Sequence, residues 1–230
     1  MRIGIILYED VEPIEIGILG TLSMAKRLAP ELQYHTLSET GGVIRLRNGL
    51  QLETEYSFAQ APAADVTIIT GGPGWKTQAN NPVLLNFLRQ RHARGDVMVS
   101  VCTGALLLAS ARLLDGRTAT SKAAYAAPET SPLSTLAEMT MNCSVREALL
   151  VDEGDIITGG GATGHLVTDS IFWSTVQGAA NDDRNVGAIV LTGAGRGFCA
   201  GGDVRAQSER AEAAASGQAT ISTEARIEDL

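Results

Sequence analysis

The chain has 230 residues and a formal net charge of −8 at pH 7. This length is enough for one large α/β domain, or for one domain with an appendage. Hydrophobic residues make up 44% of the chain and aromatic residues only 4%, so aliphatic side chains and alanine must fill the core of a globular protein. An acidic chain without a run of Lys and Arg repels phosphates, which excludes nucleic acid as an expected partner.

The cysteines predict a reducing compartment. The chain has three, Cys102, Cys143 and Cys199, which are widely spaced and form no CxxC pair. We therefore expect no disulfide framework, no metal and no cofactor. The first residues are a short apolar run and then acidic side chains, which is not the order of a signal peptide, and no apolar run is long enough to span a membrane. A cytoplasmic protein with no membrane partner is expected.

The first part of the chain alternates expected strands and helices. Residues 2–8 (RIGIILY) predict a buried parallel strand, and a helix is expected from Pro13 to Leu28, where apolar residues recur at helical spacing. A second strand is expected at residues 32–37. The pair Asn48-Gly49 between alternating segments predicts a β-hairpin.

The alternation then continues through Cys102. The expected elements are a buried strand at 65–70, a glycine-rich turn at 71–74, a helix at 82–94, a strand at 97–101 and a helix at 103–114. This order predicts a parallel sheet with helices on both faces, which binds ligands at the carboxyl ends of its strands. The glycine turn and Cys102 both fall at such ends.

The last part of the chain predicts a change of architecture. Residues 145–151 and 155–158 predict a hairpin, and a helix is expected at 164–177. After a polar joint at 181–185, a new strand is expected at 187–192, followed by a tail rich in Ala, Ser and Glu. We therefore place a domain boundary in this joint region.

Cys102 lies between a short apolar strand and an apolar helix, in the stretch SVCTGALLLAS. A helix N-terminus lowers the pKa of a thiol, because its unpaired N–H groups and positive dipole favour the thiolate. The reversal from strand to helix is similar to the nucleophile elbow of hydrolases, although only Gly104 of the two flanking glycines is present, with Ser100 in place of the other. On this pattern alone, Cys102 is either a nucleophile or a small core residue.

Several motifs occur in a characteristic order along the chain. They are the opening strand with its acidic helix start, the GGPG turn, VCTGALLLA, LLDGRTAT and EGDIITGGG. Together they resemble the DJ-1/PfpI superfamily, from Arg2 to about Gln177. The resemblance implies a flavodoxin-like, doubly wound, mostly parallel sheet, a homodimer and a small-molecule substrate, and it makes Cys102 the reactive cysteine.

The same resemblance makes Glu15 the acid that lies over the Cys102 sulfur. A carboxyl group within hydrogen-bond reach of a thiolate can carry a proton to and from a substrate if burial raises its pKa. The alternative is that Glu15 only stabilises the dipole of its own helix from the first turn. Glu12, nearer the turn, fits a solvent-exposed position better.

Gly71 and Gly72 match the family's glycine turn. The resemblance implies that their backbone N–H groups face the cysteine and stabilise a developing negative charge, and the alternative is a plain tight turn. Thr103 follows the cysteine. It either offers its hydroxyl or N–H to the same site or is an ordinary residue of the first helical turn.

No histidine stands where the amidotransferases and protease-like members of the superfamily need one to activate the cysteine. That place reads Ala119-Thr120-Ser121-Lys122-Ala123. The histidines lie elsewhere: His35 in an expected strand, His92 in an expected surface helix, and His165 near an expected strand end. A local hydrogen bond at a helix start is favoured for His165 over a role in the site.

A cysteine and an acid without histidine resemble the isonitrile hydratase branch. In that branch the thiolate attacks the isocyanide carbon and the acid protonates it, before water yields an N-substituted formamide. The VCTG stretch fits the branch, but its usual acid is an aspartate followed by Gly-Pro, whereas this chain has Ile14-Glu15 with Gly17, closer to DJ-1 itself. A glyoxalase-like reaction of small α-oxoaldehydes through a hemithioacetal is therefore the alternative.

The stretch GAIVLTGAGRGFCAGGDV resembles a second family, the crotonase (enoyl-CoA hydratase) superfamily, over roughly residues 176–206. The resemblance implies that the Ala200 N–H belongs to an oxyanion hole, but the other groups of that site lie in segments not found here. We expect a DJ-1/PfpI-like domain at residues 1–178, and a truncated crotonase-like strand-loop-helix appendage with a flexible tail at residues 179–230. Complete enoyl-CoA hydratase activity is not expected.

Two hypotheses of different classes follow. One is a cysteine-dependent enzyme in which Cys102 is the nucleophile and Glu15 carries the proton. The other is a non-catalytic dimeric binding module. Fast alkylation of Cys102 at neutral pH would favour the enzyme.

Overall fold

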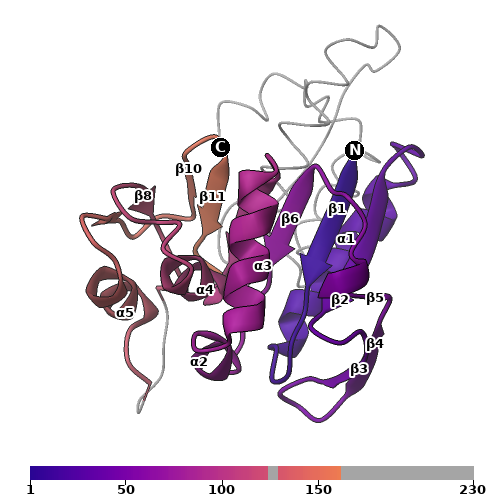
Figure 1. The fold of residues 1–230 in the computed structure, drawn as a ribbon, viewed down its shortest axis with the longest axis horizontal. Coiled ribbons are helices and arrows are strands. Elements are labelled where there is room, and N and C mark those ends of the chain that lie inside the picture. Colours follow the sequence, from indigo (N-terminus) through magenta and orange to yellow (C-terminus); the bar gives the residue numbers. More distant parts are fainter. Residues whose placement is uncertain (124–128, 162–230) are drawn as a thin grey trace, which may run out of the picture. The chain divides into compact units, whose positions relative to one another are not determined.

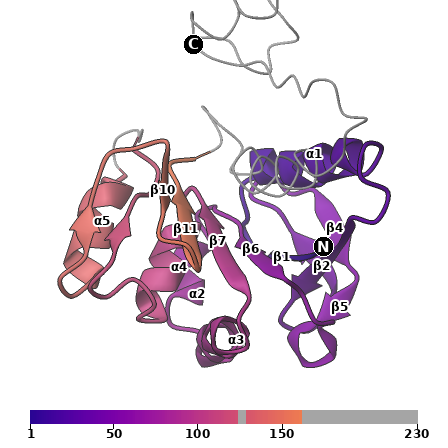
Figure 2. The same ribbon diagram turned by 90° about the horizontal axis from the view of Figure 1, so that it is seen from above.

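The computed structural model describes residues 1–123 and 129–161. Within them, the main sheet consists of β1 (Arg2–Ile6), β2 (Gln33–Ser38), β5 (Tyr56–Ser57), β6 (Val66–Ile69), β7 (Val97–Val101), β10 (Leu150–Asp152) and β11 (Ile156–Gly159). Its strand order is β10-β11-β7-β6-β1-β2-β5 (Figures 1 and 2). Neighbouring strands are parallel except for β10 and β11, which are antiparallel. This confirms the predicted mostly parallel sheet.

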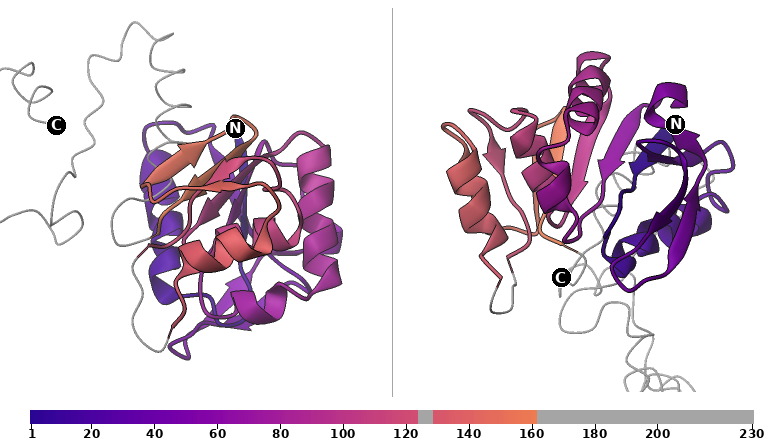
Figure 3. Two further views of the ribbon diagram at one scale, coloured as in Figure 1. Left: turned by 90° about the vertical axis from the view of Figure 1, so that its left-hand side faces the viewer. Right: turned by 60° about the horizontal axis from the view of Figure 1, so that its bottom comes forward.

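Helices lie on both faces of this sheet. The helical elements are η1 (Pro13–Ile16) and η2 (Phe58–Gln60), which are 3₁₀ turns, and α1 (Gly17–Ala25), α2 (Trp75–Gln78), α3 (Pro82–Ala93), α4 (Gly104–Ser110) and α5 (Pro132–Met139). Helix α1 covers one face, and α3 and α4 cover the other (Figure 2). Helix α5 packs beside α4, near the end of the sheet formed by β10 and β11 (Figures 2 and 3). The arrangement is the predicted doubly wound, flavodoxin-like α/β fold.

Two smaller strand pairs flank the main sheet. Strands β3 (Gly42–Arg45) and β4 (Gln51–Thr54) form the hairpin that Asn48-Gly49 predicts. Gly49 has φ +89°, a left-handed conformation that glycine adopts without steric cost. The other pair is parallel and joins β8 (Thr118–Ala119) to β9 (Ser144–Val145). The sequence patterns did not predict β8, β9 or the short helices α2 and α5.

Some predicted elements are shorter in the structure. The helix expected from Pro13 begins as the 3₁₀ turn η1, and α1 ends at Ala25. Helix α4 ends at Ser110, because the chain turns at Arg112, which has φ +63°. In the predicted 145–158 hairpin only β10 pairs with β11, because Val145 lies in β9 and pairs with β8.

Aliphatic residues fill the core, as the low aromatic content predicts. The central strands β1, β6 and β7 place Ile5, Ile69 and Val99 almost completely out of solvent. The consecutive leucines 106–108 of α4 are also fully buried. Burial of one such side chain contributes about 1.5–3 kcal/mol, so the central strands and α4 form the most stable part of the domain. The candidate site is built at one end of these same strands.

The carboxyl ends of β1, β6, β7 and β11 meet at one edge of the sheet, which we call the carboxyl edge. Gly71 lies just after β6, Cys102 follows β7, and Gly160 follows β11. The strand order reverses between β1 and β6, and ligands bind at such switch points in α/β sheets. The predicted placement of Gly71 and Cys102 at strand ends is confirmed.

Several sequence predictions fall outside the described residues. These are the helix at 164–177, His165, the joint at 181–185, and the crotonase-like stretch with Cys199 and Ala200. Within the described part of the chain, the helices are too short or too polar to cross a membrane.

Candidate functional site

Cys102 has the strained backbone of a nucleophile elbow. Its φ is +57°, a left-handed conformation that costs a residue with a side chain about 1–3 kcal/mol. Its N–H donates a 3.1 Å hydrogen bond to the Gly159 carbonyl at the end of β11. The surrounding sheet therefore holds Cys102 in a conformation that the residue would not adopt by itself.

Gly71 and Gly104 make room for this elbow. A Cβ atom at Gly71 would lie 2.6 Å from the Cys102 Cβ and 3.0 Å from its Sγ. A Cβ atom at Gly104 would overlap the Ile69 carbonyl oxygen of β6. Only glycine fits at either position, so Gly104 has a steric role at the elbow, and the turn at Gly71 lies directly against the thiol.

Glu15 projects from η1 into the same buried space. Its side chain is 1% exposed, and among the described residues neither carboxylate oxygen accepts a hydrogen bond. Burial raises the pKa of Glu15 to about 7, although the nearby Gly71 N–H and Cys102 thiol lower it and Glu12 raises it slightly. A carboxyl group with this pKa exchanges protons readily at neutral pH, as a proton carrier must.

The surroundings of Cys102 favour its protonated thiol. Burial and, second, the negative charge of Glu15 raise its pKa to about 12, although the Thr103 N–H and the Lys122 ammonium oppose this shift. The lowering expected from the helix start is therefore present but too small. Burial of Cys102, which is 9% exposed, thus outweighs the helix start, and a thiolate stabilised by the helix dipole stays a prediction.

Glu15 and Cys102 form a coupled pair of acids. Two neighbouring acids in one buried space do not both ionise readily, because each negative charge opposes the other. Glu15 has the lower pKa, so the pair ionises at the carboxyl group first. The arrangement thus holds a thiol beside a base that can take its proton when the sulfur attacks.

Thr103 fastens the glycine turn to the elbow. Its Oγ1 accepts a 2.9 Å hydrogen bond from the Gly72 N–H, and its hydroxyl lies 3.3 Å from the Gly72 carbonyl oxygen. The Gly72 N–H is therefore engaged with Thr103 and not directed at a substrate, and the Gly71 N–H lies near Glu15. The oxyanion role of Gly71 and Gly72 remains a prediction, in which Gly71 is the better placed of the two.

Three further residues border the pair, and the sequence patterns did not predict them as parts of the site. The Tyr8 hydroxyl donates a 2.8 Å hydrogen bond to the Thr70 carbonyl, and burial, Glu15 and Cys102 together raise its pKa. The Ser121 hydroxyl donates a 2.9 Å hydrogen bond to the Cys102 carbonyl. Lys122 lies in the stretch Ala119–Ala123, where other members of the superfamily have a histidine, and its charge is the signal from which it could have been found.

His35 and His92 lie away from the pair, as predicted. His35 is buried in β2, where its ring packs edge-on against Tyr56 and burial lowers its pKa. His92 is in the last turn of α3, with its Nε2 2.7 Å from an Asp155 carboxylate oxygen. Among the described residues, no group of three or more His, Cys, Asp or Glu is arranged to hold a metal ion.

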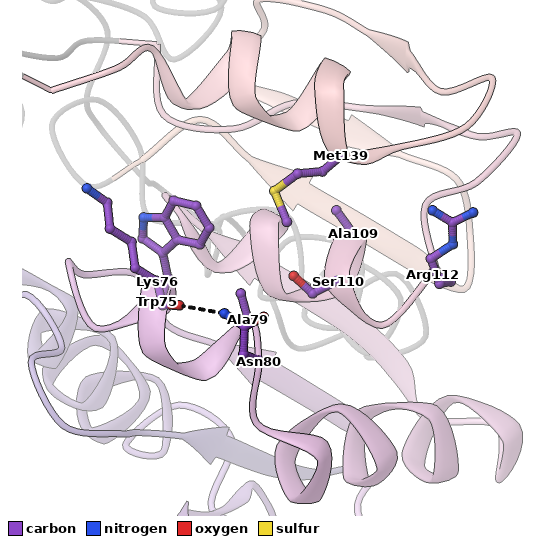
Figure 4. A pocket seen from close by; sticks show the side chains of 8 residues that line it. All are labelled: Trp75, Lys76, Ala79, Asn80, Ala109, Ser110, Arg112 and Met139. Carbon is purple, nitrogen blue, oxygen red and sulfur yellow. Dashed lines mark hydrogen bonds between the residues drawn. The ribbon is translucent and has the colours of Figure 1, made fainter.

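A separate pocket of about 450 Å³ lies between α2, α4 and α5 (Figure 4). Neither Cys102 nor Glu15 lines it. Its lining residues are Trp75, Lys76, Ala79, Asn80, Ala109, Ser110, Arg112 and Met139. Because Glu15 and Cys102 do not line this pocket, we place the candidate site at the carboxyl edge and not in the pocket.

The DJ-1/PfpI family model matches residues 1–167, which contain the elbow, the glycine turn and the Glu15–Cys102 pair. The chain belongs to the DJ-1/PfpI family. Among curated proteins, isonitrile hydratase of Pseudomonas putida is 31% identical over 163 residues, which cover 71% of this chain and 66% of that protein.

Other curated relatives are transcriptional regulators. The HTH-type transcriptional regulator GbdR of Pseudomonas aeruginosa is 33% identical over 117 residues, which cover 50% of this chain and 32% of the regulator. The chain thus spans about two thirds of isonitrile hydratase and about one third of GbdR. The chain is therefore similar both to an enzyme and to a part of longer regulators.

Solved structures show the same fold. DJ-1beta of Drosophila melanogaster superposes with a TM-score of 0.58 at 21% identity, covering 70% of this chain and 82% of that chain. An AraC family transcriptional regulator from Pseudomonas putida gives 0.59 at 24% identity, covering 70% of this chain and 84% of that chain.

Proposed function

We propose that this DJ-1/PfpI protein is a cysteine-dependent hydratase, with Cys102 as nucleophile, Glu15 as proton carrier and small isocyanides as substrates. The observation that carries the proposal is the coupled pair: a buried thiol at a strained elbow beside a buried carboxyl whose pKa is about 7. The similarity to isonitrile hydratase supports the choice of substrate.

The first half of the reaction forms a thioimidate. As the Cys102 sulfur attacks the terminal carbon of the isocyanide, its proton passes to the Glu15 carboxylate, and a carbon–sulfur bond forms. Glu15 then gives the proton to that carbon. The thiol does not need to ionise in advance, which is consistent with its raised pKa, because Glu15 accepts the proton as the bond forms.

The second half of the reaction consumes one water molecule. Water adds to the carbon–nitrogen double bond, so that the carbon gains a hydroxyl group and the nitrogen gains a proton. The carbon–sulfur bond then breaks, the hydroxyl proton returns through Glu15 to the sulfur, and an N-substituted formamide leaves. The sum is isocyanide plus water giving formamide, with Cys102 and Glu15 restored.

Product formation from cyclohexyl isocyanide tests the proposal. We expect the protein to form N-cyclohexylformamide and the Cys102→Ala variant to form it only at the buffer rate. Cys143→Ala is the matched control, since Cys143 is a partly buried thiol away from the elbow, and it should keep the activity. Equal formamide yields from the wild type and Cys102→Ala would contradict the proposal.

The glyoxalase-like alternative uses the same pair. The thiol would add to the aldehyde carbon of an α-oxoaldehyde to form a hemithioacetal, and Glu15 would move the proton from that carbon to its neighbour. The resulting thioester would be hydrolysed by one water molecule, which releases a 2-hydroxy acid and restores the thiol. Incubation with methylglyoxal tests this alternative. Lactate from methylglyoxal, with no formamide from cyclohexyl isocyanide, would favour it.

A second candidate function is ligand binding without turnover. Two observations favour it: the resting thiol is protonated and buried, and several relatives are transcriptional regulators. In this case the protein would form no product, and the melting temperature of both the wild type and Cys102→Ala would rise with N-cyclohexylformamide or another small neutral ligand.

The remaining parts of the proposal concern the whole protein. We propose that it acts as a cytoplasmic homodimer on a small molecule. We also propose that residues 1–178 form the functional domain, and that residues 179–230, with Ala200, are a truncated crotonase-like segment that does not complete an enoyl-CoA hydratase site.

A further inference from the structure

The segment that carries Lys122 is fastened to the elbow. Ser121, which precedes it, is fully buried, and its hydroxyl donates a 2.9 Å hydrogen bond to the Cys102 carbonyl. One residue earlier, the Thr120 N–H donates a 2.9 Å hydrogen bond to the Thr158 hydroxyl of β11. These two buried contacts hold the backbone at Lys122 beside Cys102.

Gly161 lies close to both the Lys122 side chain and the Cys102 backbone. A Cβ atom at Gly161 would lie 3.7 Å from both Cβ and Cγ of Lys122, and 3.8 Å from the Cys102 Cα. The first carbon atoms of the Lys122 side chain and the Cys102 backbone therefore both lie close to Gly161. Since three flexible bonds separate Cγ from the Lys122 ammonium, the ammonium can turn toward the elbow without movement of the backbone.

The other titratable groups around the thiol are acids. Glu15 projects from η1 with Glu12 beside it, and Tyr8 lies at the end of β1. Among the described residues whose charge acts on the thiol, Lys122 is the basic one. Because a negative charge removed from water needs a positive partner, any thiolate formed in this corner depends on that ammonium.

In the structure the Lys122 ammonium lies 3.5 Å from a Glu129 carboxylate oxygen. The two side chains are 34% and 53% exposed, and an ion pair of this length and exposure is weak. It holds Lys122 at the rim of the site without binding it firmly. Glu129 is therefore a competitor for the ammonium.

We propose that Lys122 is the cation that supports Cys102 in place of the missing histidine: its ammonium leaves Glu129 and stabilises the negative charge that develops on the Cys102 sulfur as Glu15 takes the proton. The inference rests on the proposed function, because it names the cation that serves the same nucleophile. Glu15 removes the thiol proton, and Lys122 stabilises the charge that remains on sulfur. No proton is transferred to or from Lys122 in this step.

The rate of Cys102 alkylation by iodoacetamide, measured from pH 7 to pH 10, tests the inference. Cys143→Ala and Cys199→Ala form the background, so that Cys102 is the thiol that reacts. We expect Lys122→Met to shift the line of alkylation rate against pH to higher pH by about one unit, which is a tenfold loss of rate at a given pH. Lys122→Arg keeps the positive charge and should retain most of the wild-type rate.

Glu129→Gln is the matched variant, for which we expect the opposite effect on the alkylation rate. It frees the ammonium, so alkylation should become faster at each pH, by a smaller factor than Lys122→Met slows it. The negatively charged reagent iodoacetate should lose more rate than iodoacetamide when Lys122 is replaced by Met. An unchanged pH–rate line in Lys122→Met would overturn the inference, even if the variant had a lowered melting temperature.

Alkylation and hydration separate the two proposals. If Lys122→Met slows alkylation but the wild type forms no formamide, the role of Lys122 stands and the proposed substrate fails. If the wild type forms formamide and Lys122→Met leaves alkylation unchanged, the substrate stands and the role of Lys122 fails.

Discussion

The two edges of the main sheet differ in how completely their polar side chains are paired. At the carboxyl edge, Glu15 is buried without a hydrogen-bond partner among the described residues, and Cys102 has a strained backbone. At the other edge, where β6, β7 and β11 begin, the carboxylates of Asp96 and Asp155 pair with basic side chains, although one buried nitrogen of Arg91 has no partner among the described residues. Native proteins seldom leave buried polar groups unpaired, and the exceptions concentrate at functional sites.

The opposite edge contains two well-paired carboxylates. Asp96, just before β7, accepts a 2.6 Å hydrogen bond from Arg91 and a 2.7 Å bond from the Thr67 hydroxyl. Asp155, just before β11, accepts two hydrogen bonds from Arg117 and lies beside His92, and these partners lower its pKa. The comparison indicates that the paired side chains of this edge stabilise the fold. At the carboxyl edge, the unpaired Glu15 carboxylate and the strained Cys102 backbone lower the stability of the fold and form the candidate site.

The largest effect should come from Glu15→Gln. The raised pKa means that the folded state binds more protons than the unfolded state between pH 4.5 and about 7, so Glu15 destabilises the fold as the pH rises through this window. At pH 8 the variant should be more stable by up to about 3 kcal/mol, and the difference should vanish near pH 4. Urea unfolding at pH 4, 6 and 8 measures this.

Activity should change in the opposite direction. Loss of the proton carrier should slow formamide production by about 10²–10⁴-fold, although the protein is more stable. Glu12→Gln is the matched control, since Glu12 is only partly buried, and it should reproduce neither effect. A Glu15→Gln variant that is less stable at pH 8 would remove the contrast between the two edges.

Gly71→Ala should have the next largest effect. The added methyl group would lie 3.0 Å from the Cys102 Sγ, so the elbow or the turn must shift, at a cost of up to about 3 kcal/mol. Cys102 alkylation should change with it. Gly20→Ala is the control, because a Cβ there meets no atom within 4 Å and alanine stabilises a helix by up to about 1 kcal/mol. Thermal unfolding of both variants shows whether the turn at Gly71 is as tightly packed as the structure shows.

Thr103→Val should destabilise the protein by about 1–2 kcal/mol. Valine keeps the shape of the side chain but leaves the buried Gly72 N–H without its acceptor. Thr103→Ser keeps the hydroxyl and should lose little stability. If chemical denaturation gave equal stabilities for Val and Ser, the hydrogen bond would not be what fastens the turn.

Asp155→Asn, at the opposite edge, should have the smallest effect. Its side chain is 49% exposed, so solvent screens the pairs with Arg117 and His92, and the loss should stay below about 1 kcal/mol. Because Asp155 lies away from Cys102, formamide production should remain unchanged. A loss of activity without a loss of stability would show that the two edges are coupled.

Composition and residue order were enough to predict the fold class, because alternating apolar strands and helices allow few arrangements. The buried strands through Val99, the Asn48-Gly49 hairpin and the turn from β7 into α4 were all predicted and are confirmed. Helix ends were less well predicted. Arg112 ends α4 through a left-handed backbone, which no local pattern indicated.

By itself, the sequence determined the apolar core and the succession of strands and helices along the chain, since hydrophobicity and spacing are properties of neighbouring residues. The family resemblance singled out Glu15 and Cys102. Only the tertiary structure decided how these two acids ionise. Their pKa values depend on burial, on the charges of Glu12 and Lys122, and on hydrogen bonds from Thr103. Tertiary packing likewise engaged the Gly72 N–H with Thr103 and placed Lys122 beside the elbow, because both contacts join segments distant in sequence.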